Sequence, residues 1–179
     1  MRLLFAVRAA ITLAGVPEAI DLADLAAVPT LIHGRTWEEM TPGTTFRTSS
    51  RTITEADVHA FVSLVGINEP LFQDARVAAE EGYSGRLVPG MMTFSYAEGL
   101  VIQGGSIHGT GLAFLSSDLT IHAPVYVGDT ITVVVEVIEQ RPTSKGDRGV
   151  ITTRNRVVNQ DGAVVMTYAP ARLTKGRDA

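Results

Sequence analysis

The chain contains no cysteine. A disulfide framework, a zinc site with cysteine ligands and a thiolate nucleophile are therefore all excluded, and the absence agrees with a reducing compartment, for which the cytoplasm is the simplest choice. Basic residues are also few, because 15 Lys and Arg stand against 19 Asp and Glu and give a net charge of -4 at pH 7. Since phosphate contacts need clustered Lys and Arg, this balance argues against a nucleic-acid partner.

Signatures of metal and nucleotide binding are missing as well. No pair of histidines has the spacing of metal ligands with a carboxylate on the same face, so no metal is expected. The GxGxxG and Walker signatures do not occur either. The sequence therefore predicts no cofactor and gives no support to nucleotide-dependent redox chemistry or phosphoryl transfer.

Long hydrophobic runs are also lacking, even at the apolar N-terminus. Arg8 and Pro17 interrupt "MRLLFAVRAAITLAGVPEAI", and a bilayer span needs about 20 apolar residues in one helix. A secretory signal, or a start site placed too far upstream, would also account for such a beginning. We interpret residues 1–35 as an N-terminal extension of one or two short helices, and we expect no membrane association.

The rest of the chain has enough apolar material for one compact domain, since 45% of its 179 residues are hydrophobic. Residues 44–53 are rich in Thr and predict a strand. Residues 54–66 predict a helix that begins at a Thr cap and ends at Gly66. A short helical stretch is expected next, with Asp74 as its cap.

Residues 90–103, "GMMTFSYAEGLVIQ", predict a helix that is apolar nearly all the way round. Only Thr93, Ser95 and Glu98 form a thin polar strip on it. A soluble chain must cover such a helix on most sides, so we expect this segment to be the centre of the core.

The second half of the chain predicts four strands that could cover this helix. Strict alternation places Ile131, Val133 and Val135 on one face, and Asp161-Gly162 is a strong hairpin signal. The expected strands, read as an antiparallel meander, are residues 111–122, 130–140, 148–158 and 162–173. The predicted fold class is therefore α+β, a curled antiparallel sheet wrapped round a long central helix.

Three short motifs occur in a recognisable order: "GINEPLFQD", "VPGMM" and "APVYVGDT". With this order and spacing, the chain from about residue 36 to 176 resembles a MaoC-type hotdog domain, the family of R-specific enoyl-CoA hydratases and related acyl-thioester dehydratases. The resemblance implies a hotdog domain over residues 36–179. It also implies an enzyme, a hydratase or dehydratase (a lyase of fatty acid metabolism) acting on an α,β-unsaturated or 3-hydroxy acyl thioester.

The family's acid-base pair falls on residues that cannot hold a proton. Its aspartate and histidine correspond to Ile67 and Phe72 in this sequence. Glu69 lies between these positions and is the expected replacement acid or base, with Asn68 orienting water or substrate. His108, in the glycine-bordered "SIHGTG", is a further catalytic candidate.

The family's means of polarising the thioester carbonyl depends on the backbone and has a counterpart here. A main-chain N-H at the start of the central helix does this in family members, and the matching donors are Gly90 and Met91. Unpaired N-H groups and the helix dipole suit a developing enolate oxygen. For the phosphates of coenzyme A, we expect Arg154 and Arg156, which share one face of a strand.

Two other functions stay open from the sequence. The chain could be a non-catalytic acyl-thioester-binding subunit of a heteromeric dehydratase, or a thioesterase on the same fold. In each case the ligand is an acyl-CoA or an acyl-carrier-protein thioester. Because a hotdog sheet has edge strands with unpaired backbone groups, we expect a homodimer or a heterodimer with a related hotdog chain.

Overall fold

The computed structural model describes residues 23, 27–28 and 32–179. The chain divides into two compact units, residues 1–31 and 32–179, and the second contains the sheet and its helices. The helices predicted within residues 1–35 lie almost entirely outside the described residues. Gly34 belongs to the second unit, since its N-H donates to the carbonyl of His108 at 2.7 Å. No helix among the described residues is long and apolar enough to cross a membrane.

The second unit contains the elements that the sequence predicts, with small shifts at their ends. The strand expected over residues 44–53 is two short strands separated by residues 48–50. The short helix expected after the Asp74 cap is present, and a further helix over Pro70–Gln73, which was not expected, precedes it. In chain order the elements are the 3-10 helix η1 (Trp37–Glu39), β1 (Thr45–Arg47), β2 (Arg51–Thr52), α2 (Glu55–Val65), α3 (Pro70–Gln73), α4 (Ala75–Glu80), α5 (Gly90–Gln103), β3 (Gly111–Ile121), β4 (Thr130–Pro142), β5 (Arg148–Val158) and β6 (Val164–Lys175).

The strands form one antiparallel sheet in the order β1-β4-β5-β6-β3, with β2 paired to β4 off this path. The meander prediction is right for β4, β5 and β6 and wrong for β3, which pairs with β6 and not with β4. The reason is the connection over residues 122–129. Its Val125 carbonyl accepts from Val88 N-H at 2.9 Å, so the chain passes the start of α5 before it enters β4.

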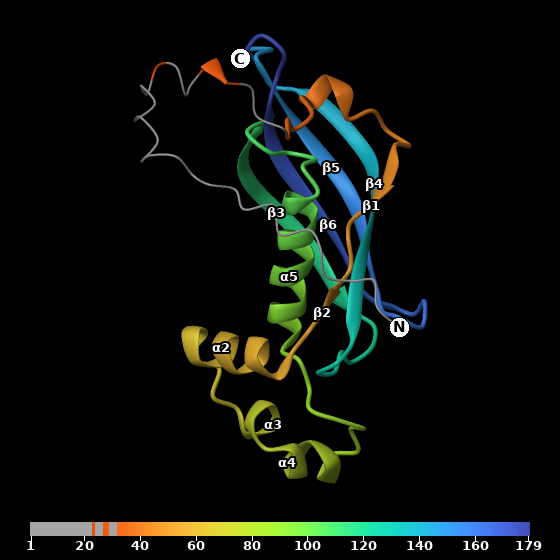
Figure 1. Ribbon diagram of the computed structural model, residues 1–179. Helices are drawn as coiled ribbons and strands as arrows, with labels where there is room; N and C mark the ends of the chain where they lie inside the picture. The colour runs from red at the N-terminus through yellow and green to blue at the C-terminus, as the bar shows by residue number, and fades with distance from the viewer. Residues whose placement is uncertain (1–22, 24–26, 29–31) are drawn as a thin grey trace, which may run out of the picture. The chain divides into compact units, whose positions relative to one another are not determined.

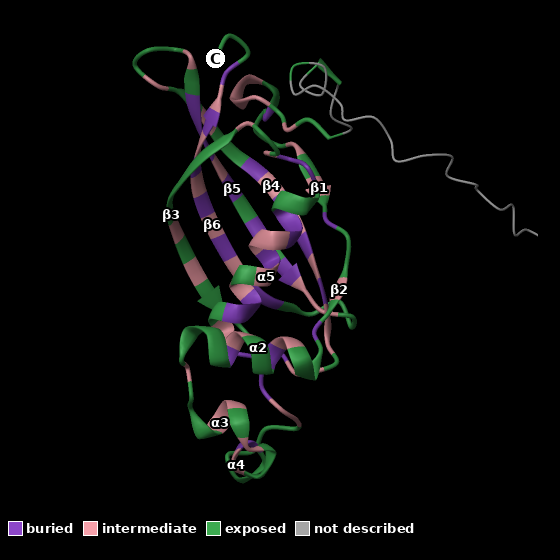
Figure 2. Cartoon of the chain, turned by 60° about the vertical axis from the view of Figure 1, so that its left-hand side comes forward, coloured by how far each residue is buried: buried purple, intermediate pink, exposed green. Residues whose placement is uncertain are grey.

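Helix α5 lies in the concavity of the curled sheet, as Figure 1 shows. Met92 and Ala97 are fully buried, and so are Ile131 and Val133 on the inward face of β4. The purple bands of Figure 2 mark these alternating inward positions along the strands. The predicted fold class, α+β with a curled antiparallel sheet round a central helix, is confirmed.

Helices α2, α3 and α4 lie beside the end at which α5 begins (Figure 1). The Thr54 side chain accepts from the N-H of Asp57, and Gly66 ends α2 in the left-handed conformation at φ 73°. Asp74 caps α4 by accepting from the N-H of Arg76, as expected. These local signals fix where the loop between α2 and α4 begins and ends.

One side of α5 is not covered, which corrects the expectation that the sheet wraps it on most sides. Met91 and Ile102 on this helix are 54% and 47% exposed. Strand β3, the neighbouring edge of the sheet, has Phe114 and Leu115 about as exposed, at 49% and 52%. These exposed apolar side chains on α5 and β3 are together called the β3 face below.

Candidate functional site

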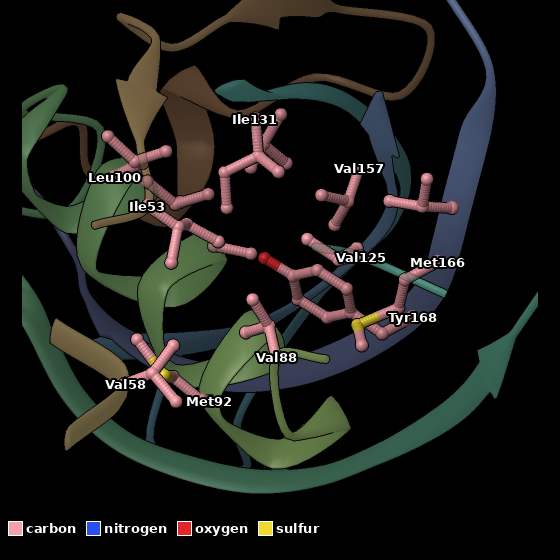
Figure 3. Packing of buried hydrophobic residues seen from close by; sticks show 14 of the residues in the cluster. Ile53, Val58, Val88, Met92, Leu100, Val125, Ile131, Val157, Met166 and Tyr168 are labelled. Carbon is pink, nitrogen blue, oxygen red and sulfur yellow. The ribbon is translucent and has the colours of Figure 1, made fainter. Parts of the chain in front are cut away.

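A pocket of about 320 Å³ lies at the start of α5. Gly90 and Thr93 line it from the helix, and Ile121 lines it from the end of β3. Its remaining wall is mainly apolar and comes from the segment before α5, the connection after β3 and the start of β6: Tyr83, Leu87, Val88, His122, Ala123, Pro124, Val125, Val165 and Met166. In Figure 3, Val88, Val125 and Met166 gather beside the ring of Tyr168.

The first turn of α5 presents two backbone donors at this pocket. Pro89 is the N-cap and its carbonyl accepts from the N-H groups of Met92 and Thr93 at 2.9 and 3.1 Å. The N-H groups of Gly90 and Met91 have no hydrogen-bond acceptor among the described residues. Together with the partial positive charge of the helix N-terminus, they suit an oxygen that gains negative charge.

Another side chain occupies the space beside Gly90. A Cβ atom built on Gly90 would collide with Cδ1 of Ile121. The two residues therefore meet across the pocket, and any larger residue at position 90 would displace Ile121.

The loop that carries the first motif does not line this pocket. Glu69 is exposed and forms the N-cap of α3 through its backbone, without a side-chain cap. The amide oxygen of Asn68 accepts from Nε2 of Gln73 at 3.0 Å, so this side chain is held within the loop itself. In the single chain, neither proposed replacement for the acid-base pair is brought next to Gly90.

The two positions of the family's acid-base pair are used for packing. Phe72 is half-buried and packs against the main core cluster, and its carbonyl accepts from Nε of Arg86 at 3.0 Å. Arg86 also forms an ion pair with Glu55 of α2. Ile67 is half-buried as well. The loop is thus fastened to the rest of the domain without a proton-transfer group at either position.

The chain is similar to several known proteins. A model of the family described as "FAS1-like, dehydratase domain region" matches residues 40–168. The chain belongs to this dehydratase family. Within it, an (R)-specific enoyl-CoA hydratase of Aeromonas caviae is 34% identical over 112 residues, which make up 63% of this chain and 79% of that protein.

A further relative agrees with this assignment, and a solved structure shows the same fold. The mitochondrial 3-hydroxyacyl-[acyl-carrier-protein] dehydratase FERN of Solanum lycopersicum is 27% identical over 117 residues, covering 65% of this chain and 67% of that protein. The structure of a MaoC-like dehydratase of Rhodospirillum rubrum matches with a TM-score of 0.73 at 22% identity, over 80% of this chain and 99% of that one. The predicted MaoC-like hotdog domain is confirmed.

In this dehydratase-family chain, His108 lies far from Gly90. It follows the C-terminal end of α5, and a helix of 14 residues is about 20 Å long at 1.5 Å per residue. His108 is exposed, and its backbone carbonyl holds Gly34. Within one chain, the structure does not bring His108 to the pocket.

The arginines expected to bind coenzyme A point away from the pocket. On β5, Asn155 and Val157 are fully buried, whereas Arg154 and Arg156 are exposed. Because strand side chains alternate, both arginines lie on the sheet face opposite α5. Arg154 also donates to Glu136 at 3.3 Å. His122, by contrast, does line the pocket, and Nε2 of its ring lies 2.8 Å from the hydroxyl of Thr167.

A buried ion pair between α5 and β6 was not predicted from the sequence. The guanidinium of Arg172 donates to both carboxylate oxygens of Glu98, at 2.5 and 2.7 Å, and to the hydroxyl of Thr153 at 3.3 Å. Nearby, burial and the charge of Glu98 raise the pKa of the Tyr168 phenol above its ordinary value. Alternation along β6 could have revealed this pair, because Arg172 falls in step with Met166 and Tyr168, which face the core.

Titratable groups elsewhere do not form a metal site. No group of three or more His, Asp or Glu side chains in the described part of the chain is placed to hold a metal ion. Asp57 shows how its carboxylate is used instead. It accepts hydrogen bonds from Thr54, from the Tyr96 hydroxyl at 3.0 Å and from Arg51 at 2.9 Å, and so ties α2 to β2 and α5.

Proposed function

We propose that this chain is a hydratase or dehydratase of acyl thioesters whose pocket at the start of α5 holds the thioester end of the substrate. The observation that carries the proposal is the pair of unsatisfied N-H groups, on Gly90 and Met91, beside a pocket of about 320 Å³. Relatives of this chain are an enoyl-CoA hydratase and a 3-hydroxyacyl-[acyl-carrier-protein] dehydratase. The substrate is accordingly an α,β-unsaturated or 3-hydroxy acyl group on coenzyme A or an acyl carrier protein.

The chemistry that these donors support is the reversible addition of water to a double bond. Water loses a proton as its oxygen bonds to C3 of the enoyl group, and the electron pair of the double bond moves towards the thioester oxygen. Hydrogen bonds from Gly90 and Met91 stabilise that oxygen, and a proton then adds to C2. In the dehydration direction the same N-H groups stabilise the enolate that forms when C2 loses its proton.

Proton transfer is proposed to involve Glu69, the ionisable residue between the two substituted motif positions. Glu69 is exposed in the single chain, so this role requires the loop or a second subunit to bring it to the substrate. The exposure of Glu69 also supports a second candidate function. In it, this chain binds the acyl thioester without catalysis, and a related subunit supplies the aspartate and histidine.

Dimerisation is proposed to occur through the β3 face. Strand β3 pairs with β6 on one side only, and its other edge is bordered by exposed Met91, Phe114 and Leu115. A second copy, paired antiparallel along β3, covers these side chains and satisfies the free backbone groups. Such pairing places the Gly111 end of one strand beside the Ile121 end of the other. His108 of the partner subunit then lies near the pocket.

The assembly can be measured directly. A particle of twice the chain mass at micromolar concentration is expected from light scattering, and Leu115→Glu should shift it to the monomer by placing a charge in the apolar interface. A wild-type monomer that retains its fold would rule out the β3 pairing. A dimer that persists in Leu115→Glu would place the interface elsewhere.

The function is tested with crotonyl-CoA and longer enoyl-CoAs, by following the loss of enoyl absorbance. If Glu69 exchanges the proton, Glu69→Gln should keep acyl-CoA binding and lose roughly 100-fold or more in turnover. The comparison variant is the double substitution Ile67→Asp with Phe72→His. Activity that appears only in the double variant, with a silent wild type, favours the binding subunit. Release of free thiol without loss of the double bond would instead indicate a thioesterase.

A further inference from the structure

The side chain of Ile121 forms the pocket wall that stands closest to Gly90. Both residues line the pocket, and Cδ1 of Ile121 occupies the position that a Cβ atom on Gly90 would need. The space beside the first turn of α5 is therefore already filled on the side of β3. Any ligand group held by the N-H of Gly90 has Ile121 as its neighbour.

Ile121 differs in its packing from three other apolar residues of the wall, Val88, Val125 and Met166. Val88 and Val125 are each 5% exposed, and Met166 is 1% exposed, so all of them belong to the core. Ile121 is 54% exposed. Its side chain thus shapes the pocket while contributing little to the core, and the pocket can be enlarged at this residue with a small loss of stability.

We infer that Ile121 restricts the site to acyl thioesters that carry no branch at C2. The inference rests on the proposed function, in which the thioester oxygen accepts from Gly90 and Met91. A hydrogen-bonded oxygen lies about 3 Å from the donor nitrogen, which keeps the carbonyl carbon and C2 beside the first turn of α5. A methyl group on C2 projects from the acyl chain next to this turn, where Cδ1 of Ile121 leaves no room.

Size exclusion of this kind has a known scale. One additional methyl or methylene group that a hydrophobic pocket cannot accommodate changes discrimination by roughly 10-fold to 200-fold. Shortening Ile121 removes the obstructing atom, so the penalty on the branched substrate should fall while the straight-chain substrate keeps its contacts with the remaining wall.

The test compares butyryl-CoA with 2-methylbutyryl-CoA by calorimetry. Both acyl groups are saturated, so the measurement needs no turnover. The wild type should prefer the unbranched ligand, and Ile121→Ala should reduce the ratio of the two dissociation constants by about 10-fold or more. The control is Ile138→Ala, since Ile138 is an isoleucine on β4 that is 38% exposed, lies outside the β3 face and does not line the pocket. It should leave the ratio within about twofold.

The outcomes separate the two proposals. If butyryl-CoA binds to the wild type and Gly90→Val abolishes binding, the site stands. An unchanged ratio in Ile121→Ala, or an equal change in Ile138→Ala, then overturns the role of Ile121 alone. If neither ligand binds to the wild type, the proposed function is wrong and the inference fails with it.

Discussion

The two halves of helix α5 use polar groups in opposite ways. At its start, the N-H groups of Gly90 and Met91 have no acceptor among the described residues and lie beside a pocket of about 320 Å³. In its second half, the Glu98 carboxylate is fully engaged by Arg172, and the two side chains are only 14% and 7% exposed. The N-H donors at the start of α5 can therefore bind a ligand, whereas the carboxylate in its second half is already bound by another side chain.

This difference shows how an open site can be held in place. A helix with unsatisfied donors gains nothing from them until a ligand binds, so its position depends on contacts made elsewhere. The ion pair joins α5 to β6, and the Tyr96 hydroxyl joins α5 to Asp57 of α2. We conclude that the polar contacts in the middle and second half of α5 fix the direction in which Gly90 and Met91 point.

The largest expected effect on stability comes from removing the ion pair in the second half of α5. Arg172→Met removes the cation and leaves the Glu98 carboxylate buried without its partner, which should lower the free energy of unfolding by about 3 to 5 kcal/mol. Denaturant titration measures this loss. The control is the double variant Glu98→Gln with Arg172→Met, which removes both charges. It should recover most of the stability, because an unpaired buried charge costs more than the absence of the pair.

At the start of α5, a substitution is expected to lower turnover. Gly90→Val should displace Ile121 and the adjacent N-H donor, and reduce turnover of an enoyl-CoA by about 100-fold to 1,000-fold, equivalent to roughly 2.7 to 4 kcal/mol. The matched control is Gly99→Val in the same helix, where an added Cβ atom would have nothing within 4 Å. A folded Gly90→Val protein with normal turnover would remove this end of α5 from the site.

Much of this fold was predictable because its signals are local. The alternation of Ile131, Val133 and Val135 predicts a half-covered strand, and the structure buries these three residues together. The place of β3 was not predictable in the same way. Which strands become neighbours depends on where the intervening chain runs, and local alternation carries no information about the path of residues 122–129.

The candidate site was predictable only where the sequence motif concerns the backbone. Gly90 was identified from "VPGMM", and the structure gives its N-H no acceptor among the described residues. The direction of Glu69 could not be predicted, because a loop has no periodicity to relate one residue to a face. Ile121 was not identified either. It meets Gly90 only because the sheet folds round α5, a contact between segments 31 residues apart in the sequence.

Asp57 of α2, which accepts a hydrogen bond from Tyr96 in the middle of α5, should make the free energy of unfolding depend on pH in the acid range. Hydrogen bonds from Thr54, from the Tyr96 hydroxyl and the charge of Arg51 lower the pKa of this carboxyl from 3.8 to about 2. A lowered pKa in the folded state adds stability that is complete above the unfolded value near 3.8 and is lost as pH falls through about 2.

The variant Asp57→Asn should therefore be less stable than the wild type at neutral pH, by about 1 kcal/mol for a lost cap interaction. Thermal unfolding at several pH values should show this difference shrinking as the pH falls from 4 towards 2. A difference that stays constant over this range would mean that the charge of Asp57 contributes no stability. The pKa of the half-exposed Asp74 carboxyl is also lowered to about 2, so part of the pH dependence remains in both proteins.

The smallest effect is expected on the outer face of the sheet, far from either half of α5. Arg154 and Arg156 were expected to bind coenzyme A, but they project from β5 on the side opposite the helix. Replacing both with alanine should leave the affinity for butyryl-CoA unchanged within about twofold, as for surface substitutions away from a site. The exposed pair of Arg154 with Glu136 should contribute no more than about 1 kcal/mol to stability. Calorimetry at low and high salt is the decisive measurement. If the double alanine variant loses affinity at low salt and the loss disappears at high salt, the arginines do meet the phosphates, and the ligand must then extend round the edge of the sheet from Gly90.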